Sequence, residues 1–170
     1  MTSEEIGRAV IVAGSGSDKE HVGRIAKSLE LYRVPYEVCV CSAHKQPLDC
    51  INLMTELNAR RSPLVIIAVA GGTDALSGAL SWGLYHPVIS CPPDGVANQS
   101  PLHNPPGSSN ATIYRPDNVG RFVAQMYAYL NPRVEVAFEG AYRDKVEALK
   151  KADSDIRSEY ERASRGGIGE

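Results

Sequence analysis

Leu64-Val65-Ile66-Ile67-Ala68-Val69-Ala70, followed by Gly71-Gly72, is the longest nearly apolar run of the chain. It has no polar residue at alternate positions, as expected for a strand in a parallel sheet that helices cover on both faces. It is also less than half the ~20 residues that a membrane helix needs. The two glycines predict a turn, and a short helix is expected over residues 74–82. The run therefore predicts the centre of an α/β fold.

Strand-like runs of small and β-branched residues flank this segment. The sequence predicts further strands over residues 9–13, 36–41 and 87–91. After the first strand, apolar residues recur at helical spacing at Val22, Ile25, Ala26 and Leu29. Ser17 or Asp18 would cap this helix, and Pro47 suits the first turn of the next. Strands alternate with helices at a repeat of roughly 25 to 30 residues, which is typical of right-handed βαβ units. This alternation predicts a three-layer α/β/α fold with a doubly wound parallel sheet.

The composition changes after the last of these strands. Residues 92–116 are rich in Pro, Gly, Ser and Asn, with a β-like patch at 111–114, and predict an ordered loop over a site. Helices are expected over residues 118–130 and, with a long apolar stripe, from residue 132 onward. We expect a single domain over residues 1–170, in which the terminal helix covers a neighbouring subunit. Its parts are an α/β core at 8–131, a helical extension at 132–164 and a frayed tail at 165–170.

Composition excludes several classes of protein. The 170 residues include 18 Lys+Arg and 20 Asp+Glu, for a net charge of −2, and 43% are hydrophobic. This is typical of one soluble globular domain. A near-neutral chain lacks the basic face that nucleic-acid binding needs, and no membrane partner is expected. The first residues lead into a strand without a cleavage pattern, so we expect no signal peptide and a cytoplasmic location.

The four cysteines show no pattern of a metal or disulfide site. Cys39, Cys41, Cys50 and Cys91 lack CxxC spacing and a paired ligand cluster. Cys39 and Cys41 would point the same way from one strand. We expect free thiols that fill the core.

Polar residues gather where the predicted strands end. Ligands of an open parallel sheet bind beyond the carboxyl ends of its strands. Four segments arrive at that edge: Gly14-Ser15-Gly16-Ser17-Asp18, Ser42-Ala43-His44-Lys45, residues 71–78 and the chain from Ser90 onward. Because the strands before them are apolar, the sequence predicts a small-molecule site at this edge.

The two glycine-rich turns each allow more than one interpretation. The turn at residues 14–18 offers N–H groups and hydroxyls at a helix N-terminus, which suits a phosphate, although it lacks the GxGxxG and Walker spacings. A plain turn capped by Asp18 explains it as well, and Asp18 could instead bind the hydroxyls of a ribose. In the second turn, Thr73 or Asp74 could cap the helix, and Ser77 could donate to a ligand.

His44 beside Lys45 is the pair that best suits chemistry. It combines a group that titrates near neutral pH with a fixed cation for an anionic ligand. A surface histidine beside a solvated lysine is the competing interpretation, which the position at the ligand edge disfavours. Structural roles are expected for His21 and His86, and His103 is left open.

Together, residues 14–18, 42–45 and 70–78 resemble the family of phosphoribosylaminoimidazole carboxylases and N5-carboxyaminoimidazole ribonucleotide mutases of purine biosynthesis, in order from about Val10 to Asn131. The glycine loop and Lys45 are similar to the second class, which uses carbon dioxide directly. The first class usually has a second histidine in that loop and arginine in place of Lys45. The resemblance implies a flavodoxin-like fold, a homo-oligomer (tetramer or octamer), no cofactor or metal, and conversion of 5-aminoimidazole ribonucleotide and carbon dioxide to 4-carboxy-5-aminoimidazole ribonucleotide.

The resemblance also implies roles for single residues. His44 would transfer the proton of the ring carbon. Contacts with the ribonucleotide or carbon dioxide are implied for Gly14, Ser15, Gly16, Ser17, Asp18, Ser42, Ala43, Lys45, Ala70, Gly71, Gly72, Thr73, Asp74, Ala75, Leu76 and Ser77. The chain departs from the second class at residues 72–74, where that class tends to have Ser-Asn in place of Thr73-Asp74 and often a basic residue in place of Gly72. The added carboxylate and the missing cation would disfavour an anionic carboxylate nearby, and Asp74 could instead face the amino group of the ring or cap the helix. Mutase activity, and a nucleotide-binding protein without the chemistry, are the alternatives.

Overall fold

The computed structural model describes residues 7–166, in which five strands form one parallel sheet in the order β2-β1-β3-β4-β5. The strands are β1 (Arg8–Ala13), β2 (Tyr36–Val40), β3 (Leu64–Val69), β4 (Val88–Ser90) and β5 (Asn110–Thr112). The helices are α1 (Lys19–Leu31), α2 (Pro47–Ala59), α3 (Ala75–Gly83), α4 (Pro116–Tyr127) and α5 (Pro132–Gly166), with short 3₁₀ turns η1 (Gly16–Asp18), η2 (Gly95–Ala97) and η3 (Ser100–His103). The strand order is the flavodoxin-like one, and it confirms the predicted doubly wound sheet.

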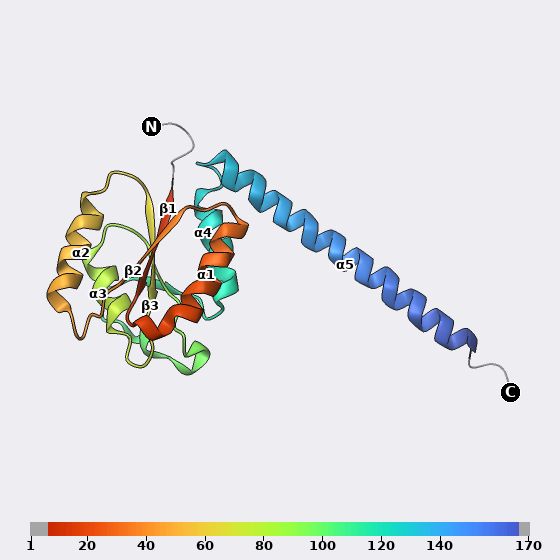
Figure 1. Ribbon diagram of the computed structural model, residues 1–170, viewed down its shortest axis with the longest axis horizontal. Helices are drawn as coiled ribbons and strands as arrows, with labels where there is room; N and C mark the ends of the chain where they lie inside the picture. Colours follow the sequence, from red (N-terminus) through yellow and green to blue (C-terminus); the bar gives the residue numbers. More distant parts are fainter. Residues whose placement is uncertain (1–6, 167–170) are drawn as a thin grey trace.

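The central strand β3 is buried along its whole length, as its sequence predicts. Its residues alternate between two hydrophobic clusters. Val65, Ile67 and Val69 belong to the cluster with α1 and α4, and Leu64, Ile66 and Ala68 to the cluster with α2 and α3. Both faces of the sheet are therefore covered, and Figure 1 shows the two helical layers on opposite sides of it.

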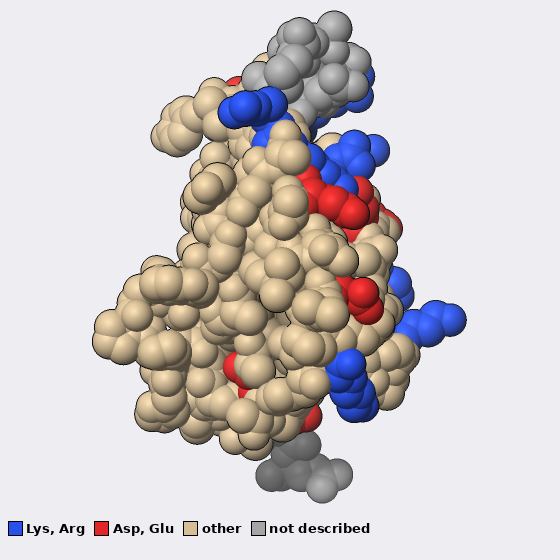
Figure 2. All heavy atoms as spheres, turned by 90° about the vertical axis from the view of Figure 1, so that its left-hand side faces the viewer, with Lys and Arg blue, Asp and Glu red and all other residues tan. Residues whose placement is uncertain are grey.

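The surface of the α2/α3 layer differs from an ordinary solvated face. Figure 2, which looks onto this side, shows a broad area almost without charged side chains. Large apolar residues are exposed on it, among them Leu48, Ile51, Trp82 and Tyr85. Apolar patches of this kind commonly mark contact surfaces.

Helix α5 leads away from the α/β body (Figure 1). Along it, the apolar residues Tyr142, Leu149, Ile156 and Tyr160 are exposed. The helix continues through Gly166, so the first two residues of the tail that was expected to fray are helical, and residues 167–170 lie outside the described part. Among the described residues, no helix is both long and apolar enough to cross a membrane.

Element boundaries differ from the sequence-based prediction mainly where strands are short. β2 and β3 each end one residue earlier than expected, and β4 is confined to Val88–Ser90. The β-like patch expected at 111–114 is β5, an edge strand that pairs with β4 and begins at Asn110. Helix α4 begins two residues before the expected start because Pro116 takes its first position, where its missing N–H costs nothing.

Candidate functional site

The strand register brings the predicted site segments to one edge of the sheet. Ala13, the last residue of β1, pairs with Val40 on one side and Val69 on the other. The chain segments that follow these residues meet around a cavity of about 440 Å³. It is lined by Gly14, Ser15, Ser17, Asp18, Ser42, Ala43, His44, Lys45, Ala70, Gly71, Gly72, Thr73, Ala75, Leu76, Pro93 and Asp94. Gly16, Asp74 and Ser77 do not line it.

The first segment forms a short turn before α1 and leaves polar groups facing the cavity. Ser15 caps η1, because its Oγ accepts a hydrogen bond from the Ser17 N–H at 3.2 Å, and the two hydroxyls lie 2.8 Å apart. Of the two caps expected for α1, Asp18 stands at the N-cap position, but its side chain makes no capping bond, and Ser17 lies one residue earlier within η1. The Asp18 carboxylate is therefore available to a ligand.

The second segment is a tight turn between β2 and α2. Ser42 shapes it, because its Oγ accepts a hydrogen bond from the Lys45 N–H at 3.3 Å and its carbonyl accepts one from the Gln46 N–H at 2.7 Å. The turn exposes His44 and Lys45 on the cavity wall. Within residues 7–166 no hydrogen bond holds the His44 ring, so both of its nitrogens are open to a ligand.

The third segment is the glycine turn after β3, residues 70–77. Gly72 has φ +64°, a backbone conformation that favours glycine. Asp74 caps α3: its Oδ1 accepts from the Ser77 N–H and its Oδ2 from the Ser90 hydroxyl, both at 2.8 Å. Asp74 is 3% exposed and Ser77 is fully buried. The capping interpretation of Asp74 is confirmed, and both residues support the wall from behind instead of facing a ligand.

Sequence reasoning missed two residues of the wall, Pro93 and Asp94. Asp94 Oδ2 accepts a hydrogen bond from the Gly72 N–H at 2.6 Å, which ties the loop after β4 to the glycine turn. The segment from Ser90 onward was expected at this edge, but no motif within it singles out a residue. The one signal that could have indicated Asp94 is its position soon after the buried strand that ends at Ser90.

A family model described as AIR carboxylase matches residues 8–148, most of the chain. The chain belongs to the AIR carboxylase family. It is 33% identical over 162 residues to a human bifunctional phosphoribosylaminoimidazole carboxylase/phosphoribosylaminoimidazole succinocarboxamide synthetase. That match covers 92% of this chain and 38% of the human protein, so the chain spans well under half of that relative.

Shorter relatives match over nearly their whole length. A phosphoribosylaminoimidazole carboxylase of Treponema denticola is 26% identical over 153 residues, which cover 87% of this chain and 96% of that one. The crystal structure of Treponema denticola PurE has a TM-score of 0.83 at 26% identity, over 88% of this chain and 98% of that one. The AIR carboxylase fold thus extends over most of the described residues.

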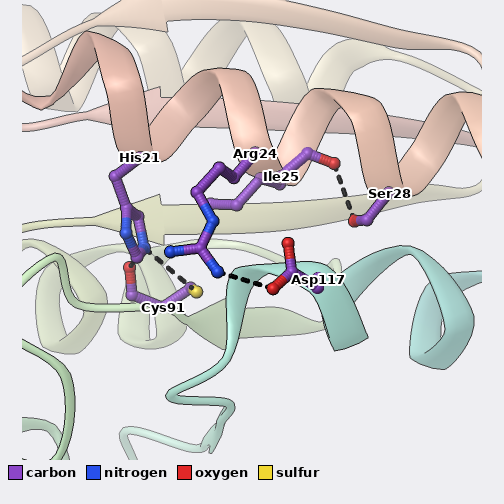
Figure 3. A network of polar contacts seen from close by, with 6 residues as sticks. All are labelled: His21, Arg24, Ile25, Ser28, Cys91 and Asp117. Carbon is purple, nitrogen blue, oxygen red and sulfur yellow. Dashed lines mark hydrogen bonds and ion pairs between the residues drawn. The ribbon is translucent and has the colours of Figure 1, made fainter.

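Two histidines of this AIR carboxylase family member have the structural roles expected of them. Figure 3 shows His21 Nε2 beside Cys91, 3.1 Å from its carbonyl oxygen and 3.4 Å from its Sγ. Burial lowers the pKa of His21, although the hydrogen bond to Cys91 opposes that effect. His86 Nε2 lies 3.1 Å from the Leu57 carbonyl oxygen. His103 is exposed at the end of η3 and does not line the cavity.

The cysteines are free thiols, as predicted, and three of them are buried. Cys41 and Cys50 bring their sulfur atoms to 2.8 Å in the core below the second segment. Burial raises the pKa of Cys50 and Cys91 to about 12, and that of Cys39 to about 11. These thiols therefore stay protonated near neutral pH. Within residues 7–166, no three His, Cys, Asp or Glu side chains cluster closely enough to hold a metal ion.

Proposed function

We propose that this chain carboxylates 5-aminoimidazole ribonucleotide with carbon dioxide to give 4-carboxy-5-aminoimidazole ribonucleotide. The observation that carries the proposal is the cavity that His44 and Lys45 share with the hydroxyls of the first turn and the glycine turn. Its volume of about 440 Å³ lies within the usual range of small-molecule pockets. Membership of the AIR carboxylase family supports the same substrate.

The polar wall of the cavity suits a ribonucleotide monophosphate. Ser15, Ser17 and Lys45 offer hydroxyl donors and an ammonium group, which would hold the phosphate. Asp18 has a carboxylate that makes no cap bond and would accept hydrogen bonds from the ribose hydroxyls. The ring would then lie toward His44 and the glycine turn.

His44 would move the proton that the reaction displaces. The enamine-like ring carbon attacks carbon dioxide, and the new carbon–carbon bond leaves that carbon with both a carboxylate and its original proton. A neutral His44 takes this proton, and the electron pair of the broken C–H bond restores the aromatic ring. In the reverse direction, the imidazolium form of His44 returns the proton to the carbon and carbon dioxide leaves.

An assay of substrate choice tests the proposal. Purified protein is incubated with 5-aminoimidazole ribonucleotide and bicarbonate without ATP, and product formation is expected. Turnover only of the N5-carboxyamino isomer would instead assign the mutase activity. Binding of the ribonucleotide without turnover of either substrate would assign a nucleotide-binding protein that lacks the chemistry.

The variant His44→Asn tests the role of the imidazole. We expect kcat to fall by about 100-fold or more, while ribonucleotide affinity stays within several-fold, because asparagine preserves polarity but cannot transfer the proton. His103→Asn, which changes an exposed imidazole outside the cavity, serves as the matched control. Wild-type kcat in His44→Asn would refute this mechanism.

We also propose that the protein works as a homo-oligomer, a tetramer or an octamer. Two surfaces support this. One is the charge-poor α2/α3 face (Figure 2). The other is helix α5, which leads away from the body (Figure 1) and exposes Tyr142, Leu149 and Ile156 at intervals of seven residues. A helix with such a repeat buries its stripe against another helix. Since α5 leads away from its own body, the partner would be a second copy of the chain.

A further inference from the structure

Asp94 is a charged residue of the cavity wall to which the proposed reaction gives no role. It stands at the N-cap position of η2, yet its side chain makes no capping bond there. An aspartate in that position ordinarily accepts from the N–H groups of the following turn. Here its Oδ2 instead accepts from the Gly72 N–H at 2.6 Å, so the side chain is directed across to the glycine turn.

The glycines of the turn allow this contact. A Cβ atom added to Gly71 would lie 3.1 and 3.2 Å from the two oxygens of the Asp94 carboxylate, and Gly72 adopts φ +64°. The carboxylate thus lies against the backbone of the turn. In a glycine-rich anion site, N–H groups at this place would face the ligand.

Other N–H groups of the same turn also have acceptors within the protein. The pairs are Asp74 N–H with Ser100 Oγ at 2.8 Å, Ala75 N–H with Thr73 O at 3.1 Å and Ser77 N–H with Asp74 Oδ1 at 2.8 Å. An anionic group of a ligand near these four donors would therefore meet the Asp94 charge and N–H groups that are already engaged. Such a group is disfavoured for both reasons.

The remaining charges of the wall do not compensate for Asp94. Among the described lining residues, the charged side chains beside His44 are Asp18, Lys45 and Asp94. Lys45 is the single cation of this set, and the proposed phosphate contact uses it. Asp94 Oδ1 has no hydrogen-bond partner within residues 7–166, so it can accept a hydrogen bond from a donor on the ligand.

We propose that Asp94 determines specificity by favouring a ring that carries an N–H donor and no carboxylate. The inference rests on the proposed function. The exocyclic amino group of 5-aminoimidazole ribonucleotide donates to Asp94 Oδ1, whereas the carboxylate of the N5-carboxyamino isomer is repelled. The carboxylate of the product is repelled in the same way, so Asp94 also favours product release.

The variant Asp94→Asn tests this role, because the asparagine oxygen can still accept from the Gly72 N–H while the charge is removed. Binding is measured by titration calorimetry in a His44→Asn background, which prevents interconversion of the probes. The probes are 5-aminoimidazole ribonucleotide and its 4-carboxy derivative. We expect the ratio of their dissociation constants, carboxylated over uncarboxylated, to fall about tenfold. The change should shrink at high salt.

Asp153→Asn, which removes the same charge from the exposed helix α5, is the matched control and should leave the ratio unchanged. A ratio in Asp94→Asn within about twofold of the background value overturns the proposal, because a residue that only holds the glycine turn in place would affect the binding of both probes alike. Failure of both probes to bind the wild-type chain overturns the proposed function, and the role of Asp94 with it. Binding of both probes with an unchanged ratio removes only the role of Asp94.

Discussion

The two helical layers cover the same sheet but differ in how closely they are packed and paired. In the α1/α4 layer, Gly120 lets the helices approach until its N–H donates to Ser28 Oγ at 2.9 Å. Arg24 pairs with Asp117 at 2.5 Å across the same helices, and His21 contacts Cys91 (Figure 3). These contacts join α1 to α4 and to the segment after β4 within one chain.

The α2/α3 layer packs its inner residues against the sheet but exposes large apolar residues on its outer face. Its inner residues fill the second core cluster, whereas Leu48, Trp82 and Tyr85 are 73%, 72% and 88% exposed. Burial of the sheet does not require these side chains to be apolar. The proposed contact with another copy would remove their apolar surface from water.

The largest effect on stability is expected from a side chain placed in the close contact between α1 and α4. In Gly120→Ala the new Cβ would lie 2.0 Å from the Ser28 carbonyl oxygen, which is backbone and cannot yield without moving a helix. We expect a loss of about 3 kcal/mol of unfolding free energy, measured by urea denaturation.

Gly140→Ala is the matched control, because a Cβ on Gly140 of α5 meets nothing within 4 Å. It should raise the stability of the helix by about 0.5–1 kcal/mol. Equal effects of the two substitutions would show that the close approach of α1 and α4 is unimportant.

A smaller effect on folding, but a clear one on assembly, is expected in the open layer. The double variant Leu48→Ser/Tyr85→Ser removes exposed apolar surface and should weaken association at least about tenfold, as measured by sedimentation velocity. Leu31→Ser, an exposed position at the end of α1, is the control. Wild-type assembly of the double variant would exclude this face as the contact.

The smallest effect concerns the dependence of stability on pH, and it tests whether His21 of α1 is desolvated in the folded protein. Because burial lowers the pKa of His21, the unfolded chain binds the proton more readily than the folded one. Stability is therefore retained above the ordinary histidine pKa of about 6.5 and falls as the pH drops from there toward the folded value. His21→Gln should reduce the loss between neutral and mildly acidic pH in denaturation experiments. An unchanged pH dependence would mean that His21 is not desolvated in solution.

Much of the fold and of the cavity wall follows from local sequence patterns. The apolar run of β3 and the alternation of strands with helices predict a covered parallel sheet, and parallel strands necessarily bring their carboxyl-end segments together. The short strand β5 was harder to predict, since Asn110–Thr112 is only half-buried and joins the sheet through pairing with β4. Such an edge strand depends on its neighbour more than on its own composition.

The sequence by itself predicted the doubly wound parallel sheet, the segments at the ligand edge and, through its resemblance, the family. Only the tertiary structure decided which polar groups face the cavity. Asp74 and Asp94 are both aspartates next to the glycine turn, yet Asp74 is enclosed by Ser77 and Ser90 while Asp94 reaches the wall. The reason is physical: hydrogen-bond partners distant in the chain determine where a carboxylate points, and residue type alone does not specify those partners.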